Sequence, residues 1–313
     1  MAANNTFMEQ FNFATKQFSN WLNADNISEI MVNPGGELWI DILGKGMENT
    51  GVTLNPTMSR TIINLVASHT KTTVSEDRPI ISAELPDGSR FEGLIPPVVT
   101  TPSFSIRKHG SLILTLADYV KSGIMTEEQK EKIENGVRTR QNILVVGGTG
   151  SGKTTLVNAV VAAISQLTPE HRIITIEDTK ELKVDAPNWV SLRTSDYIDM
   201  NRLLKSCMRL RPDRILVGEV RGPEALSLLK AWNTGHPGGC ATVHADSAEK
   251  ALTRLEQLIQ EANVPESVAR PVIAEAVNIV VFMERSATGR RIREIISVQG
   301  YDRANGTYKL EDV

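Results

Sequence analysis

The segment NILVVGGTGSGKTTL, residues 142–156, decides the fold class of this 313-residue chain. It fits the pattern GxxxxGK[ST] from Gly147 to Thr154 without a mismatch. The apolar run Ile143 to Val146 before the pattern predicts a buried strand, and the apolar segment from Leu156 to Leu167 predicts a helix. Glycines let a backbone wrap an anion with inward-pointing N–H groups, and the following helix adds the positive end of its dipole. The segment therefore predicts a phosphate-binding loop.

Two side chains of this loop carry chemistry of their own. Lys153 is a mobile cation suited to the β- and γ-phosphate oxygens, and the Thr154 hydroxyl is suited to hold Mg²⁺. The alternative is a glycine-rich turn that matches by chance, which the flanking strand and helix disfavour. The residues expected to contact a nucleotide here are Gly147, Gly148, Thr149, Gly150, Ser151, Gly152, Lys153, Thr154 and Thr155.

Composition limits the classes of function. Lys and Arg number 34 against 37 Asp and Glu, so the chain lacks the global basic excess of a DNA-coating protein, although a local basic channel stays possible. The two cysteines, Cys207 and Cys240, provide neither a CxxC zinc site nor a disulfide framework. No run reaches the roughly 18 to 20 apolar residues of a membrane helix, and the first residues lack the pattern of a signal peptide. We expect a cytoplasmic protein.

The pattern of apolar residues predicts three regions. Residues 1–108 are typical of a small α+β domain, with helices over 4–22 and 57–69 and strands over 28–33, 37–41, 80–85, 90–95 and 104–108. Residues 109–140 predict a helical linker, in which Thr126 and Gln129 can form a capping box.

Residues 141–313 alternate between strands and helices, which predicts an α/β domain with a parallel sheet and crossover helices. The last strands, over 278–283, 292–298 and 307–310, are closely spaced and separated by glycine turns. The expected strands before them cover 143–146, 173–176, 190–193, 214–217 and 239–243, and the expected helices cover 156–167 and 198–209 and begin at 223 and 247.

Acidic residues follow two of the predicted strands. Glu177 and Asp178 come after the strand 173–176, and Glu219 follows the strand 214–217. Acids at the carboxyl ends of strands beside a phosphate-binding loop are candidates for the general base or for Mg²⁺ ligands. Because Gly218 stands where such strands usually carry an aspartate, the Mg²⁺ role falls to Glu219 or to the Glu177 and Asp178 pair. The alternatives are a helix cap for Glu177 and Asp178 and a surface acid for Glu219.

Cations and histidines complete the candidate set. The arginines at positions 209, 211, 214 and 221 are expected around the same sheet edge, with solvated surface positions as the alternative. His236 begins the tight turn HPGG, and His244 ends a strand at the edge that faces the nucleotide. A sensor of the γ-phosphate is one interpretation of these histidines, and a structural histidine is the other.

Four segments together carry a resemblance to a known family: GGTGSGKTT (147–155), TIEDTKEL (175–182), MRLRPDRILVGEVRGPEA (208–225) and NTGHPGGCATVHADSAEKALTRL (233–255). They resemble the nucleotide-site boxes of the secretion traffic ATPases, and the resemblance runs from about residue 26 to the end of the chain. Within that superfamily the wording is most similar to the type IV secretion ATPases and to their conjugative-transfer branch. The four-cysteine metal insert of the type II secretion motors has no counterpart here, since the chain has two cysteines.

The resemblance implies a RecA-like ATPase domain that binds ATP and Mg²⁺ and assembles into a homohexamer. It implies Glu177 as general base with Glu219 in the Mg²⁺ shell, or the reverse, and it places His236 and His244 in the histidine box. It also implies that Arg107, in SIRKH, and Arg90, in DGSRFEG, contact the nucleotide from the N-terminal domain.

The implied function is an ATP-driven motor of a conjugative system that powers pilus assembly or delivery of DNA or protein. The implied partners are the inner-membrane channel and the coupling proteins, with the motor peripheral at the cytoplasmic face of the inner membrane and no nucleic acid bound directly. Three alternatives stay open: a pilus-biogenesis motor outside conjugation, a nucleotide-dependent switch or adaptor, and a DNA translocase.

Overall fold

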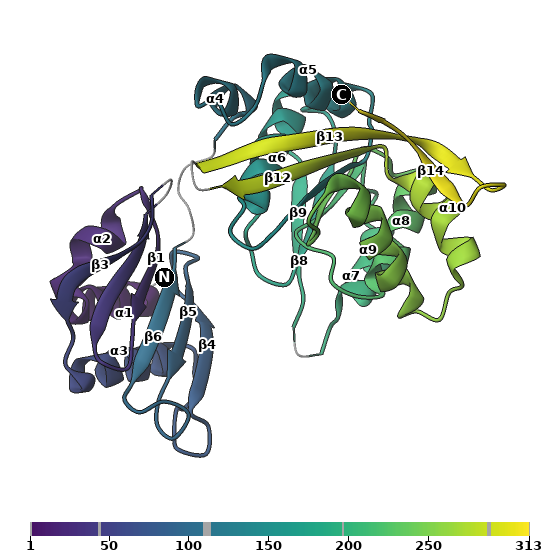
Figure 1. Cartoon of the computed structure of the whole chain (residues 1–313). Coiled ribbons are helices and arrows are strands. Elements are labelled where there is room, and N and C mark those ends of the chain that lie inside the picture. Colours follow the sequence, from purple (N-terminus) through teal and green to yellow (C-terminus); the bar gives the residue numbers. More distant parts are fainter. Residues whose placement is uncertain (1, 43–44, 109–113, 196, 287–288, 313) are drawn as a thin grey trace. The chain divides into compact units, whose positions relative to one another are not determined.

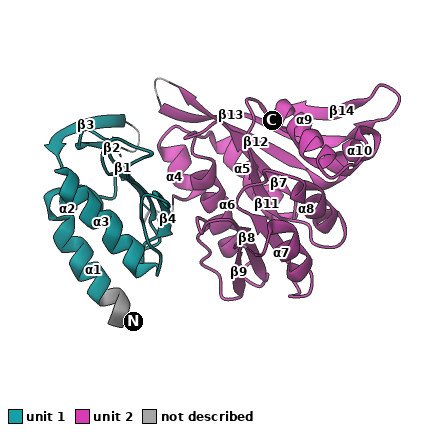
Figure 2. Ribbon diagram, turned by 90° about the horizontal axis from the view of Figure 1, so that it is seen from below, with its two compact units in different colours: residues 1–112 teal, residues 113–313 magenta. Residues whose placement is uncertain are grey.

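The computed structural model describes residues 2–42, 45–108, 114–195, 197–286 and 289–312, which form two compact units, residues 1–112 and 113–313 (Figures 1 and 2). Each unit has its own sheet and its own apolar core. None of the helices in these described ranges is both long and apolar enough to cross a membrane.

The first unit is an antiparallel sheet covered by helices. Its sheet has the order β3-β2-β1-β6-β5-β4, and aromatic and aliphatic side chains of α1 and α3 pack on it in one core. Asn55 begins α3 by accepting hydrogen bonds from the backbone of residues 57 and 58. The elements are α1 (Ala2–Ala14), the 3₁₀ helix η1 (Lys16–Phe18), α2 (Ser19–Asn23), β1 (Ile27–Val32), β2 (Glu37–Ile42), β3 (Gly46–Thr53), α3 (Pro56–His69), β4 (Ile80–Glu84), β5 (Arg90–Leu94) and β6 (Ser103–Arg107).

Two features of this unit differ from the sequence prediction. The helix predicted over 4–22 is broken: α1 ends at Ala14, the short 3₁₀ helix η1 follows, and Phe18 at its end is buried in the core. The edge strand β3 was not predicted, since GMENTGVT is polar and glycine-rich and its pairing with β2 is set by the hairpin. The other predicted strands and the helix over 57–69 are confirmed.

The second unit is built around an eight-stranded sheet of order β14-β13-β12-β7-β11-β10-β8-β9. The strands from β12 to β9 run parallel, whereas β13 and β14 are antiparallel additions at one side. The strands are β7 (Ile143–Gly147), β8 (Ile173–Glu177), β9 (Trp189–Arg193), β10 (Arg214–Val217), β11 (Cys240–Val243), β12 (Ile279–Ser286), β13 (Gly289–Asp302) and β14 (Thr307–Asp312).

Helices cover both faces of this sheet (Figure 1). Along β7, Leu144 and Val146 pack in a core with α7 to α10, while Ile143 and Val145 pack in a core with α4 to α6. This two-sided burial explains why β7 is a continuous apolar run. The helices are α4 (Leu116–Lys121), α5 (Glu127–Arg138), α6 (Lys153–Leu167), α7 (Met200–Cys207), α8 (Glu224–Asn233), α9 (Ala248–Gln260) and α10 (Glu266–Ala276).

The predicted alternation of strands and helices is confirmed, and so is the capping box between Thr126 and Gln129. Helix α10 was missed because Pro271 lies inside it. The helices α4 and α5, predicted as a linker, contribute Leu116, Tyr119 and Ile133 to the core around α6. The first five linker residues, 109–113, lie outside the described residues.

Candidate functional site

The phosphate-binding loop connects the carboxyl end of β7 to the first turn of α6. Gly147, Gly150 and Gly152 have φ values of 155°, 70° and 99°, which residues other than glycine rarely adopt. A Cβ on Gly147 would also lie 2.4 Å from the carbonyl oxygen of Met283 on β12. The loop conformation therefore depends on glycine both for its dihedral angles and for its close contact with the neighbouring strand.

Lys153 lies over the loop. Its Nζ donates to the carbonyls of Gly147 at 2.8 Å and Gly148 at 2.9 Å, and it lies 3.4 Å from Nε2 of His244. The residue is only 8% exposed, so its charge is directed at the loop rather than at bulk solvent. The structure thus brings the predicted lysine and the second predicted histidine together.

A chain of polar contacts continues from His244 along the carboxyl edge of the sheet. His244 Nε2 lies 3.1 Å from Oε1 of Glu219, whose other oxygen accepts from Arg221. Arg221 also lies 4.0 Å from Asp178. Burial lowers the pKa of His244, and the nearby Lys153 charge lowers it further. His244 is therefore a neutral imidazole at neutral pH, and it adds no further positive charge beside Lys153.

Glu177 ends β8 and is only 2% exposed. Its Oε1 accepts from the backbone N–H groups of Glu181 and Leu182, both at 2.8 Å, whereas its Oε2 has no hydrogen-bond partner among the described residues. Burial raises the pKa of the Glu177 carboxyl. A Cβ on Gly218 would meet the Glu177 side chain at 3.1 Å, so the glycine after β10 leaves room for this carboxylate. The arrangement suits a base, because one oxygen is fixed and the other has no partner.

One group of predicted cations lies at the wrong edge. Arg209 and Arg211 precede β10 and Arg214 begins it, so these three arginines lie at the amino end of the strand, opposite the loop. Of the four predicted arginines only Arg221, which follows β10, lies at the carboxyl edge. Arg214 is fully buried and donates to His171 Nδ1 at 3.0 Å and to the carbonyls of Gly238 and Val137 at 2.9 Å and 2.8 Å. The prediction that these three arginines surround the nucleotide edge was wrong, because they lie at the amino end of β10, whereas Glu219 follows its carboxyl end.

His236 shares this opposite edge. Its Nδ1 donates to the carbonyl of Pro212 at 2.8 Å, at the start of the turn that precedes β11, whereas His244 follows β11. The two histidines therefore lie at opposite ends of one strand, and within one chain His236 does not join the group around Lys153.

Arg90 and Arg107 belong to the first unit, where the structure brings them together. They are directly opposite each other in the antiparallel ladder of β5 and β6, at the end of both strands. Their predicted contact with nucleotide remains a prediction.

Sequence reasoning missed three residues near the loop. Arg290 of β13 donates through Nε to the carbonyl of Gly150 at 3.1 Å, and Arg285 of β12 lies opposite it in the ladder. Asn158 of α6 is buried and bonds to the backbone of residues 181 and 183 at 3.0 Å and 2.8 Å, which fixes the segment that in turn holds Glu177. Asn158 could have been found as a polar residue inside the apolar run of α6. No local feature of the sequence marked Arg285 and Arg290 as neighbours of the loop.

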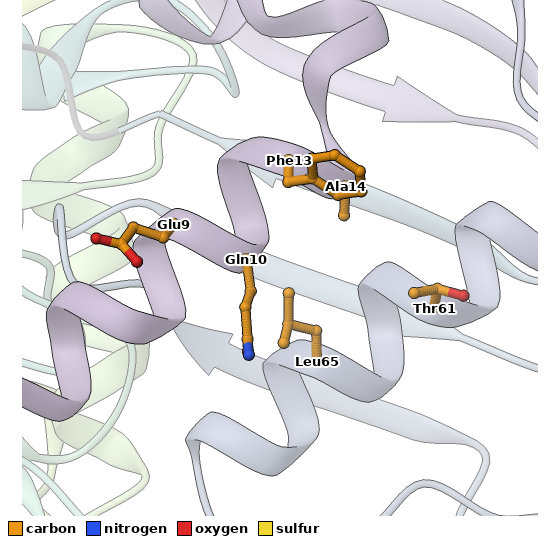
Figure 3. A pocket seen from close by; sticks show the side chains of 6 residues that line it. All are labelled: Glu9, Gln10, Phe13, Ala14, Thr61 and Leu65. Carbon is orange, nitrogen blue, oxygen red and sulfur yellow. The ribbon is translucent and has the colours of Figure 1, made fainter.

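A concave surface lies in the first unit, between α1 and α3 (Figure 3). This groove has a volume of about 440 Å³ and carries no cation suited to phosphate. Its lining residues are Glu9, Gln10, Phe13, Ala14, Thr61 and Leu65. The candidate nucleotide site therefore remains at the loop.

Comparison with known proteins identifies the family and several relatives of this chain. The family model described as type II/IV secretion system protein matches residues 16–294. The chain is 50% identical over 291 residues to the conjugal transfer protein TrbB of Rhizobium radiobacter, covering 93% of this chain and 88% of that protein. It is 31% identical to the type IV secretion system protein VirB11 of Bartonella henselae, covering 88% and 90% of the two chains.

A solved structure shares the fold. The X-ray structure of the Yersinia pseudotuberculosis ATPase DotB superposes with a TM-score of 0.69 at 21% identity, covering 93% of this chain and 79% of that chain. The predicted α/β fold class is confirmed, and the predicted resemblance to the conjugative-transfer branch is confirmed by the TrbB match.

Proposed function

Because the chain belongs to the type II/IV secretion system protein family, we propose that it is an ATP-hydrolysing motor of a type IV secretion system for conjugal transfer. The observation that carries the proposal is the contact chain at one sheet edge, from Lys153 of the phosphate-binding loop through His244 to Glu219. The identity of 50% to a conjugal transfer protein favours conjugation over the other pilus motors.

The residues have distinct roles in this proposal. The loop backbone and Lys153 bind the phosphates, and Thr154 with Glu219 would hold Mg²⁺. Glu177 acts as the general base: its raised pKa and unpartnered Oε2 suit it to take a proton from the attacking water. Neutral His244 lies between Lys153 and Glu219, and its Nε2 either accepts from Lys153 or donates to Glu219 according to its tautomer, so the residue can respond to the γ-phosphate.

The oxygen donors fit a hard cation. Thr154 supplies a hydroxyl and the two glutamates supply carboxylates, which are the ligand types that Mg²⁺ takes at phosphate sites. The unpartnered buried Oε2 of Glu177 also leaves it available as the ligand in place of Glu219. When bound, Mg²⁺ neutralises part of the triphosphate charge. ATP binding to wild type, Glu177→Gln and Glu219→Gln is measured at several Mg²⁺ concentrations to distinguish the two assignments. The variant that has lost the Mg²⁺ ligand should require a higher Mg²⁺ concentration to bind ATP.

We further propose that the chain acts as a homohexamer at the cytoplasmic face of the inner membrane, with Arg90 and Arg107 of the first unit closing on bound ATP. Partners are the channel and coupling proteins of the conjugative system. The relation of Arg90 to Arg107 on adjacent strands supports a shared ligand for the two.

The decisive experiment measures phosphate release by purified wild type and Lys153→Ala, and conjugal DNA transfer by a deletion strain complemented with each. The variant is expected to lose hydrolysis and transfer together. ATP hydrolysis at the wild-type rate by Lys153→Ala would refute the proposal that the chain is an ATP-driven motor. Light scattering with and without a non-hydrolysable ATP analogue tests the ring, and a monomer under both conditions would contradict it.

A further inference from the structure

Two arginines face each other across the β12–β13 ladder. Arg285 and Arg290 are a directly opposed cross-strand pair. Like charges at such positions repel and destabilise the hairpin. Within the described part of the chain neither guanidinium forms an ion pair, and the acid next to Arg285 on β12, Glu284, is held by Arg291 at 2.8 Å and Arg293 at 2.9 Å. The arginine pair therefore places two positive charges together, and no acid among the described residues forms an ion pair with either of them.

Both arginines lie beside the phosphate-binding loop. Arg290 Nε donates to the carbonyl of Gly150 at 3.1 Å, and its Cδ is 3.2 Å from the position a Cβ would take on Gly152. Arg285 Nη1 is 3.2 Å from the corresponding Cβ position on Gly150. The two charges are thus added to that of Lys153 around one short loop.

The hairpin is fixed in this place by its backbone. β12 pairs in parallel with β7, and Met283 is in register with Gly147 at the start of the loop. On the next strand Ile292 donates its N–H to the carbonyl of Ile124 at 2.8 Å, between α4 and α5. Buried Tyr119 of α4 lies within the electrostatic reach of Arg290. The arginines are therefore carried by strands that are anchored to β7 and to the segment between α4 and α5.

We propose that Arg285 and Arg290 form a clamp for the phosphate tail of the nucleotide bound in the loop. Arg290 is a positioning residue, which fixes the loop through Gly150, and Arg285 supplies a cation to the phosphate oxygens. The anion offsets the repulsion between the two guanidinium groups, so nucleotide binding and hairpin stability are coupled. The clamp rests on the proposed function, since it requires a nucleoside triphosphate in the loop.

The test is calorimetric titration of the full-length protein with ATP and Mg²⁺. Arg285→Gln and Arg290→Gln are each expected to bind about tenfold more weakly than wild type, the scale of one charge-assisted contact. Arg285→Lys should recover most of the affinity because it restores the cation. Arg290→Gln should also lower kcat, since the loop loses a support. The matched control is Arg293→Gln, which removes the same charge from the same strand while Arg291 still holds Glu284.

Thermal melting separates the clamp from a merely structural role. Without nucleotide, Arg285→Gln is expected to melt no lower than wild type because the repulsion is relieved, and ATP is expected to raise its melting temperature less. Affinities of both glutamine variants equal to wild type, or a loss equal to that of Arg293→Gln, would overturn the clamp alone. A nucleotide-free Arg285→Gln that melts well below wild type would overturn it as well. Wild type that binds no ATP would instead overturn the proposed function.

Discussion

Replacing Glu177 by glutamine separates its proposed chemistry from its place in the fold. The side chain keeps its shape, and an amide oxygen can still accept from the backbone of Glu181 and Leu182. Loss of the carboxylate removes the proposed base, so turnover is expected to fall roughly 10²- to 10⁴-fold while ATP still binds. Phosphate release and calorimetric ATP binding measure the two effects.

Glu177→Gln is expected to raise the stability of the folded protein although it lowers turnover. The two backbone hydrogen bonds weaken by about 1 kcal/mol each when their acceptor loses its charge. The raised pKa shows that burial of the charge outweighs these bonds. The pKa of Glu177 is higher in the folded chain than in the unfolded chain, where it is near 4.5. The resulting contribution to folding stability is therefore complete below pH 4.5 and is lost as pH rises through the pKa of the folded state. At pH 7, Glu177→Gln should therefore unfold at a higher denaturant concentration than wild type, and the difference should shrink toward pH 4.

Alanine at the same position provides the structural comparison. It leaves the two N–H groups without their acceptor, which costs roughly 1–3 kcal/mol for each that stays buried, so Glu177→Ala should unfold more readily than wild type. Glu170→Gln is the control for turnover, since Glu170 is exposed in the turn after α6 and takes no part in the candidate site. ATP hydrolysis by Glu177→Gln within threefold of wild type would refute Glu177 as the base, and a Glu177→Gln protein less stable than wild type at pH 7 would refute the stabilising effect expected from loss of the buried charge.

Three further predictions test the sheet edges. Because the pKa of His244 is lowered, stability should fall as pH drops below about 6.5 toward the folded pKa, and His244→Gln should lessen this fall in denaturant titrations between pH 7 and 5. Arg214→Met should cost roughly 3–5 kcal/mol in unfolding free energy because buried acceptors lose their donor, whereas Arg211→Met at an exposed position should cost under about 1 kcal/mol; equal costs would contradict the structural role. Gly239→Ala places a Cβ 2.0 Å from Trp232 Nε1, so a melting temperature several degrees lower is expected, and an unchanged melting temperature would show that the turn yields.

The candidate site was predictable where its signals are local. The glycine pattern at 147–154 and the acids directly after apolar strands are short-range features, and they identified Lys153, Glu177 and Glu219. The arginines around 209–214 misled the prediction because charge near a strand does not say which end it occupies. The first and last residues of a four-residue strand are about 10 Å apart, so Arg214, which begins β10, and Glu219, which follows it, lie at opposite edges of the sheet.

The sequence by itself determined the phosphate-binding loop, the alternation of strands and helices, and the family, because these depend on residue type and on spacing within a few turns of chain. Tertiary structure alone decided which distant residues meet at the loop. The spatial strand order, with β12 and β11 on the two sides of β7, brings His244 to Lys153 and the hairpin arginines to Gly150. That order results from packing of the two sheet faces against helices, and no local pattern in the sequence encodes it.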